Sequence, residues 1–305
     1  MPVEKDLKTI LKKIQFTDDA QVMKQLVDQS LQVKIRMGQI KRKIVVMSGK
    51  GGVGKSMTTA NLAVAFARQG DRVGVLDVDL NGPCIPKMLG VKGKFEITPD
   101  GALPLVGPYG MKIASMDFFL KHENSPVRWK GPMELSPVWL GLMEMNVIRE
   151  FLADILWGEI DYLFTDLPPG AAADKPPVIA QFIPELDGAV VVTTPSEVAK
   201  QVVKKSIVYA RDVGIPIIGL VENMSGALCP QCGTGVAFFE GGCEDLCAEL
   251  DVPLLGKIPF DSKLSQANDR GEPLPAGHPI SKQFDQIATR IKEHLNFKKI
   301  LAEKL

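Results

Sequence analysis

The stretch from Ile44 to Ser56 decides the fold, and it reads Ile-Val-Val-Met-Ser-Gly-Lys-Gly-Gly-Val-Gly-Lys-Ser. A short β-branched run ends in a glycine-rich loop that closes with Gly-Lys-Ser, the pattern of a phosphate-binding loop between a strand and a helix. Its glycines let backbone N–H groups face phosphate oxygens, and the following helix N-terminus attracts the same anion. We therefore expect a nucleoside triphosphate site, with Lys55 on the β- and γ-phosphates and Ser56 as a ligand of Mg²⁺.

Beyond this loop the sequence alternates between apolar strands and helical segments. Strands are expected at residues 44–47, 73–77, 162–166, 189–193, 217–221 and 254–258. Helices are expected at residues 61–69, 147–157, 196–213, 242–250 and 279–295. This alternation indicates an α/β fold with a doubly wound, mostly parallel sheet of the P-loop NTPase type. Ligands of such folds bind at the carboxyl ends of the strands.

The chain also divides along its length. Apolar residues at helical spacing before the first strand predict a short helical N-terminal extension over residues 1–40. The P-loop ATPase domain is expected over residues 41–305, with a C-x-x-C metal-cluster segment at about residues 222–250. Residues 90–144 are irregular and are interpreted as an excursion from the sheet. The last helix is expected to pack on the sheet.

Composition excludes several classes of protein. The formal net charge is zero, which argues against a general nucleic-acid binder or an acidic-membrane binder. No apolar run reaches the roughly 18 residues that a membrane span needs, and the N-terminus lacks the layout of a signal peptide. We expect a cytoplasmic protein with no nucleic-acid or membrane partner. In that compartment the five cysteines indicate metal or redox chemistry more than disulfides.

Besides Lys55, four charged residues are expected to act on the nucleotide. Lys50 directly follows the opening glycine of the loop and can reach a neighbouring subunit's nucleotide as a cation during phosphoryl transfer. Asp77 and Asp79 follow the second strand, where a carboxylate can order water near Mg²⁺ or the γ-phosphate. Asp166 ends the third strand, as a Walker B aspartate that holds Mg²⁺ through water does.

The cysteines fall into unequal groups. Cys229 and Cys232 form a C-x-x-C turn, and Cys243 and Cys247 lie eleven and fifteen residues beyond Cys232. Three interpretations stay open: a four-thiolate Zn²⁺ site within one chain, a thiol redox motif, or half of an iron–sulfur site that a second copy completes by two-fold symmetry. Cys84 stands alone in a loop and is expected to be structural or incidental.

The motifs taken together resemble the Mrp/ApbC-type iron–sulfur cluster carrier ATPases, members of the deviant P-loop group that also holds MinD and ParA. Lys-Gly-Gly-Val-Gly-Lys-Ser, Asp-x-Asp-x-x-Gly-Pro, Trp-x-Gly-Pro-Met and Asp-Leu-Pro-Pro-Gly follow one another in that family's order. The most specific match is Val-Glu-Asn-Met-Ser at residues 221–225 followed by Cys-Pro-x-Cys-Gly at residues 229–233. The likeness runs from about Lys43 to the last helix.

The resemblance implies a homodimer that binds ATP and Mg²⁺, carries a [4Fe–4S] cluster on two C-x-x-C pairs and delivers it to apo iron–sulfur proteins. It makes Lys50 the signature lysine, Asp79 the first switch aspartate and Asp166 the Mg²⁺-associated one. It places Asn223 on the adenine and makes Cys229 and Cys232 the cluster ligands. The same resemblance assigns nucleotide binding to the phosphate loop, namely Gly49, Gly51, Gly52, Val53, Gly54, Lys55, Ser56 and Met57.

The chain departs from the family pattern in a few places. Met57 replaces a hydroxyl residue, Cys84 stands where serine is usual, and Cys243 replaces a glycine. The loop at residues 169–174 is one residue longer than usual, and residues 134–146 are extra sequence.

Three functions are therefore compared. The first is an ATP-hydrolysing cluster carrier with slow turnover. The second is a positioning or partition ATPase that resembles MinD or ParA, which needs a membrane helix or a DNA-binding patch. The third is a nucleotide switch whose C-x-x-C segment is a structural zinc knuckle.

Overall fold

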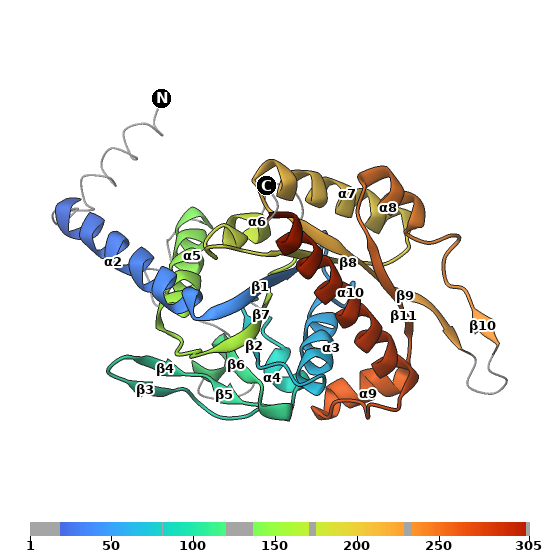
Figure 1. Cartoon of the computed structure of the whole chain (residues 1–305), viewed down its shortest axis with the longest axis horizontal. Coiled ribbons are helices and arrows are strands. Elements are labelled where there is room, and N and C mark those ends of the chain that lie inside the picture. Colours follow the sequence, from blue (N-terminus) through green and yellow to red (C-terminus); the bar gives the residue numbers. More distant parts are fainter. Residues whose placement is uncertain (1–18, 81, 120–136, 171–174, 229–233, 303–305) are drawn as a thin grey trace.

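A central sheet of nine strands organises the computed structural model, which describes residues 19–80, 82–119, 137–170, 175–228 and 234–302 (Figure 1). The strand order is β10-β9-β8-β1-β7-β2-β6-β5, and β11 pairs with β9. The strands are β1 (Ile40–Met47), β2 (Val73–Asp77), β5 (Leu105–Val106), β6 (Lys112–Ser115), β7 (Ile160–Asp166), β8 (Gly188–Thr193), β9 (Ile217–Leu228), β10 (Gly235–Val236) and β11 (Leu254–Phe260). The pairings are parallel except those of the short strands β5 and β10.

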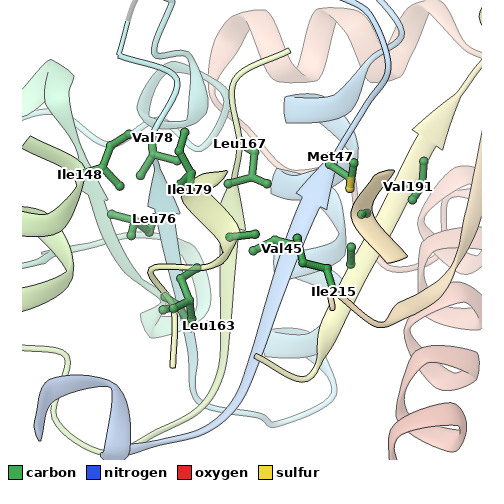
Figure 2. Packing of buried hydrophobic residues seen from close by; sticks show 14 of the residues in the cluster. Val45, Met47, Leu76, Val78, Ile148, Leu163, Leu167, Ile179, Val191 and Ile215 are labelled. Atoms are coloured by element: carbon green, nitrogen blue, oxygen red, sulfur yellow. The ribbon is translucent and has the colours of Figure 1, made fainter. Parts of the chain in front are cut away.

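Helices cover both faces of this sheet. One layer holds α2 (Asp19–Gly38), α5 (Pro137–Asp154), α6 (Lys175–Ala180), α7 (Glu197–Asp212) and α8 (Glu244–Leu250). The other holds α3 (Lys55–Arg68), α4 (Ile85–Met88), α9 (Ser262–Arg270) and α10 (Pro279–Ala302). The sequence of β1 explains both layers, because side chains alternate along a strand. Val45 and Met47 join the first core, which Figure 2 shows in part, and Ile44 and Val46 join the second.

The doubly wound, mostly parallel α/β fold expected from the sequence is confirmed. All six expected strands are present, and β2 has the expected bounds. Strand β1 begins four residues earlier than expected. Strand β9 runs seven residues further, to Leu228, because it pairs with β11 as far as Ala227 and with β10 at Ala227 and Leu228.

The interpretation of residues 90–144 as an excursion from the sheet is wrong in part. Strand β6 from this region pairs in parallel with β2 and extends the central sheet, while β3 (Glu96–Thr98) and β4 (Gly101–Leu103) form a separate hairpin. Four residues that include Lys112 and Ser115 carry too little apolar pattern to identify a buried strand. Of the extra sequence at residues 134–146, the part from Pro137 onward forms the first turns of α5.

The two terminal helices are both attached to the body. In α2, Val33 and Met37 are buried, and the Arg36 Nε donates to the Ala153 carbonyl oxygen of α5 at 3.2 Å. In α10, Ile287, Ile291 and Leu295 are buried, so the expected packing of the last helix on the sheet is confirmed. A search of the described residues finds no helix that combines the length and the apolar character needed to cross a bilayer.

We expect Phe66→Ala to lower the free energy of unfolding by about 3–5 kcal/mol, as large-to-small changes of buried aromatic residues do. Phe66 is fully buried between α3 and the sheet, with ring centroids 4.6 Å from Tyr162 and 5.0 Å from Phe164. Urea denaturation measures the loss. Val198→Ala, at a position 66% exposed, is the control and should change stability by less than about 0.5 kcal/mol. A loss below about 1 kcal/mol for the Phe66 variant would contradict this packing.

Candidate functional site

The site lies where the carboxyl ends of three neighbouring strands meet. The phosphate loop follows β1 and leads directly into α3, which begins at Lys55. The register of the sheet pairs Asp77, the last residue of β2, with Asp166, the last residue of β7, and pairs Asp166 with Val46 of β1. Parallel pairing therefore brings the loop and both carboxylates to one edge, as the sequence predicts.

Asp166 is the centre of the hydrogen-bond network at this edge. Its side chain is fully buried and accepts from the Lys55 ammonium at 2.7 Å, the Ser56 hydroxyl at 2.5 Å and the Thr59 hydroxyl at 2.6 Å. Lys55 is itself only 6% exposed and also donates to the Ser56 hydroxyl at 3.0 Å. Three donors from the first turns of α3 thus hold one carboxylate of β7. The hydroxyl of Ser56 and the oxygens of Asp166 are the hard donors that Mg²⁺ prefers.

Asp77 is a second, fully buried carboxylate next to the first. It accepts from the backbone N–H groups of Asp79 at 3.2 Å, Cys84 at 3.1 Å and Ile85 at 3.2 Å, so it holds both ends of the loop that carries Asp79. Burial and the nearby charge of Asp166 raise the pKa of Asp77 to about 8, although Lys55 and the backbone donors oppose the shift. Asp79 itself is half-buried on this loop.

Asn223 of β9 reaches the phosphate loop from the side opposite α7. Its side-chain amide donates to the Val53 carbonyl oxygen at 2.8 Å. Gly54 has a left-handed backbone (φ 84°), and a Cβ there would lie 2.2 Å from the Asn223 amide nitrogen. Glycine at this position is thus required both by the turn and by the close approach of Asn223.

The remaining residues of the phosphate loop lie around the contact between Asn223 and Val53. The Ser48 hydroxyl donates to the carbonyl oxygen of Lys50, which is half-buried, and no carboxylate within the described ranges pairs with the Lys50 ammonium. Val53 is buried and Met57 is half-buried in the first turn of α3. Gly49 packs against α7, and the more exposed Gly51 and Gly52 complete the loop.

The two cysteines of the C-x-x-C turn, Cys229 and Cys232, lie outside the described residues. Cys243 and Cys247 are buried in the first core. Burial raises the pKa of both thiols, that of Cys247 to about 11. Burial likewise raises the pKa of Cys84, at the start of α4, to about 11. The described residues contain no group of three or more His, Cys, Asp or Glu side chains that could hold a metal ion. This environment favours a packing role for all three.

The sequence interpretation missed three polar residues of this region. Thr59 lies four residues after Lys55 on α3, so helical spacing could have placed it beside the phosphate loop. Ser115, whose hydroxyl is 3.5 Å from the Asp77 carboxylate, lies on the unrecognised strand β6. Glu222 is buried in β9 although a lone glutamate after an apolar strand gives no signal of burial.

Comparison with known proteins gives the family. A family model described as ParA, NUBPL iron-transfer P-loop NTPase, matches residues 39–293. The chain belongs to this family. A relative from Saccharolobus solfataricus named iron-sulfur cluster carrier protein is 46% identical over 266 residues, which cover 86% of each chain. A relative of the same name from Methanocaldococcus jannaschii is 45% identical over 279 residues, covering 90% of this chain and 92% of the relative. The resemblance stated from the motifs is confirmed.

Solved structures agree with the fold. A nucleotide-binding protein from Archaeoglobus fulgidus in complex with ADP shares 38% sequence identity with this chain at a TM-score of 0.67. The match covers 79% of this chain and 91% of that protein. The cell division ATPase MinD of Pyrococcus furiosus shares 20% identity at a TM-score of 0.58, over 83% of this chain and 99% of that one. The MinD match establishes the shared fold alone.

The raised pKa of Asp77 predicts a pH dependence for the NTPase without nucleotide and metal. The native carboxyl keeps its proton up to about pH 8, whereas the unfolded one releases it near pH 3.8. The native state therefore binds more protons within this window, and its free energy of unfolding falls as the pH rises through it. One such group contributes a slope of at most about 1.4 kcal/mol per pH unit.

Urea denaturation at pH 5, 6, 7 and 8 measures this slope. We expect Asp77→Asn to flatten it, because the variant has no proton to lose there. Asp100→Asn, at an exposed turn, serves as the matched control and should leave the slope unchanged. Equal slopes for the wild type and the Asp77 variant would show that this carboxyl does not carry the effect.

Proposed function

We propose that the chain is an ATP-binding and ATP-hydrolysing iron–sulfur cluster carrier, which holds a [4Fe–4S] cluster at a homodimer interface and transfers it to apoproteins. The observation that carries the proposal is the path of β9. Asn223 of this strand touches the phosphate loop, and the strand ends at Leu228, immediately before Cys229 of the C-x-x-C turn. The strand that touches the phosphate loop thus leads directly to the residue before the C-x-x-C turn, in a family described by iron transfer.

Each part of the nucleotide site has a proposed task in hydrolysis. The backbone of residues 49–54 and the α3 N-terminus bind the phosphates. Lys55, whose ammonium lies 2.7 Å from Asp166, would leave that carboxylate for the β- and γ-phosphates when Ser56 and Asp166 hold Mg²⁺, an ion that would polarise the phosphate oxygens. Asp79, on the loop fixed by Asp77, orders the attacking water. Lys50 of one chain reaches the nucleotide of the other chain, where it stabilises charge that develops during transfer.

The count of available thiols supports the proposed homodimer. A [4Fe–4S] cluster takes four thiolates, and the C-x-x-C turn supplies two. Cys243 and Cys247 are buried in the core and Cys84 lies half-buried at the start of α4, so a second copy related by a two-fold axis would supply the other two. The cluster is then the cargo of the dimer. The proposal keeps the cytoplasmic location expected from the sequence, since free thiols persist in a reducing compartment.

Anaerobic reconstitution with iron and sulfide tests the cargo site. We expect the double variant Cys229→Ser and Cys232→Ser to lose iron binding, because serine oxygen replaces the soft ligands. Wild-type protein should bind four iron atoms per two chains and elute as a dimer, as measured by iron analysis and light scattering. The matched control, Cys243→Ser and Cys247→Ser, should keep the iron. Zinc that copurifies and depends on all four cysteines would replace this proposal with the zinc-knuckle interpretation.

The proposed role of Lys50 gives a kinetic prediction. Lys50→Ala should lower kcat for ATP hydrolysis by about 10²–10³-fold, the effect of removing one donor to a transition-state oxygen. The affinity for Mg-ADP within a single chain should stay unchanged, because Lys50 acts across the dimer. Steady-state kinetics and calorimetry measure the two quantities. Lys263→Ala, on the exposed side of α9, is the control. An unchanged kcat for the Lys50 variant would remove Lys50 from catalysis.

A further inference from the structure

Thr59 is a fully buried threonine of α3 to which the proposed hydrolysis gives no task. Its hydroxyl lies 2.6 Å from Oδ1 of Asp166 and 3.0 Å from the Lys55 carbonyl oxygen. A hydroxyl has one proton to donate, and a carbonyl oxygen four residues back in a helix already accepts a backbone N–H. The contact with Asp166 is as short as hydroxyl bonds to carboxylates usually are, roughly 2.5–2.7 Å. The proton of Thr59 is therefore donated to Asp166.

The preceding residue of α3 is also a threonine and bonds differently. Thr58 is equally buried, and its hydroxyl donates to the Gly54 carbonyl oxygen at 2.8 Å, four residues back. Such a bond to the main chain is frequent for a threonine within a helix. Thr59 instead contacts the end of β7, where the carboxylate of Asp166 is a stronger acceptor than an amide carbonyl. The bond to Asp166 is thus specific to position 59.

The two oxygens of the Asp166 carboxylate have different partners. Oδ2 accepts from the Lys55 ammonium at 2.7 Å and from the Ser56 hydroxyl at 2.5 Å, whereas Oδ1 accepts from Thr59. The proposed function assigns both partners of Oδ2 to the nucleotide and its Mg²⁺. Thr59 lies one turn further along α3 than Lys55 and has no exposure to solvent. Its hydroxyl is therefore the donor that stays with Asp166 when the other two change partners.

We propose that Thr59 is a positioning residue, which fixes the Asp166 carboxylate when Lys55 and Ser56 turn to the nucleotide and Mg²⁺. The inference rests on the proposed function, which assigns Asp166 to that metal. The terminal torsion of an aspartate is broad, so the carboxylate is free to rotate once its donors leave. The bond from Thr59 holds Oδ1 against α3 and keeps Oδ2 directed at Ser56. It also satisfies Oδ1, since a buried acceptor without a donor is destabilising.

Nucleotide affinity with and without Mg²⁺ tests this role in the full-length protein. Calorimetry gives the dissociation constant of ADP in excess Mg²⁺ and in EDTA, and the ratio of the two constants measures the contribution of the metal. Thr59→Val keeps the shape of the side chain but has no hydroxyl. We expect this variant to bind Mg-ADP about 10–100-fold more weakly, the usual effect of removing a group that orients a metal ligand. Its affinity for ADP in EDTA should equal that of the wild type, because the phosphate loop is unchanged.

The control variants separate positioning from folding. Thr59→Ser restores a hydroxyl at the same position and should bind Mg-ADP as the wild type does. Ser206→Ala removes another buried hydroxyl, which donates to the Val202 carbonyl oxygen within α7, and should leave both affinities unchanged. Circular dichroism and urea denaturation establish that each variant is folded. Thr59→Ala also lacks the hydroxyl and takes the place of Thr59→Val if the valine variant does not fold.

The inference alone would be overturned if Mg²⁺ strengthens binding to the wild type and Thr59→Val binds Mg-ADP equally well. An equal loss of affinity in EDTA, or a Thr59→Ser variant as weak as Thr59→Val, would also overturn it, because the hydroxyl would then have no part in metal binding. Wild-type binding that is indifferent to Mg²⁺ would overturn both this inference and the assignment of Asp166 to the metal. The cargo site is tested separately, by reconstitution with iron.

Discussion

The buried ion pair between Lys55 and Asp166 is the constraint on which the site depends. A carboxylate with no exposure to water is stable only with a close cation and further donors, and breaking such a pair costs about 3–5 kcal/mol. Asp166 finds these partners in Lys55, Ser56 and Thr59, all in the first turns of α3. The end of β7 and the start of α3 are therefore held at fixed separation. The phosphate loop spans β1 and α3, so its two ends are fixed by the same interaction.

The charges at this edge do not balance. Asp77 and Asp166 lie side by side at the ends of paired strands, and Lys55 is the cation that acts on both. Without a further cation, the protein relieves the excess by holding a proton on Asp77, whose pKa rises to about 8. A divalent cation would relieve the same excess without that proton. Oxygen ligands of the kind that Mg²⁺ prefers, together with an excess negative charge, therefore lie at the edge where a magnesium-bound nucleotide would bind.

The sequence predicts those parts of the protein that a few neighbouring residues are enough to identify. The phosphate loop is a contiguous motif, β2 is a short apolar run, and Asp166 directly follows an apolar strand, so each is readable from a few neighbouring residues. Strand β6 and the burial of Glu222 are different, because neither the four residues of β6 nor a charged residue after an apolar run indicates burial. Their burial is determined by partners far along the chain: β2 lies about 40 residues before β6, and Lys257 and Cys243 satisfy Glu222. The role of Cys229 and Cys232 stays a prediction, because both residues lie outside the described ranges.

The length of β9 relates the two halves of the proposed function. Its partner β8 ends opposite Glu222, and β9 continues for six more residues, to Leu228. At roughly 3.3 Å per residue, this extension reaches at most about 20 Å past the end of β8, and it pairs with β11 as far as Ala227. Figure 1 shows β9 and β10 projecting there, away from the helical layers. A labile cluster must be reachable by a second copy and by an acceptor, whereas nucleotide chemistry needs a dry, rigid edge. One strand that is buried at Glu222 and Asn223 and continues to Leu228 can serve both requirements.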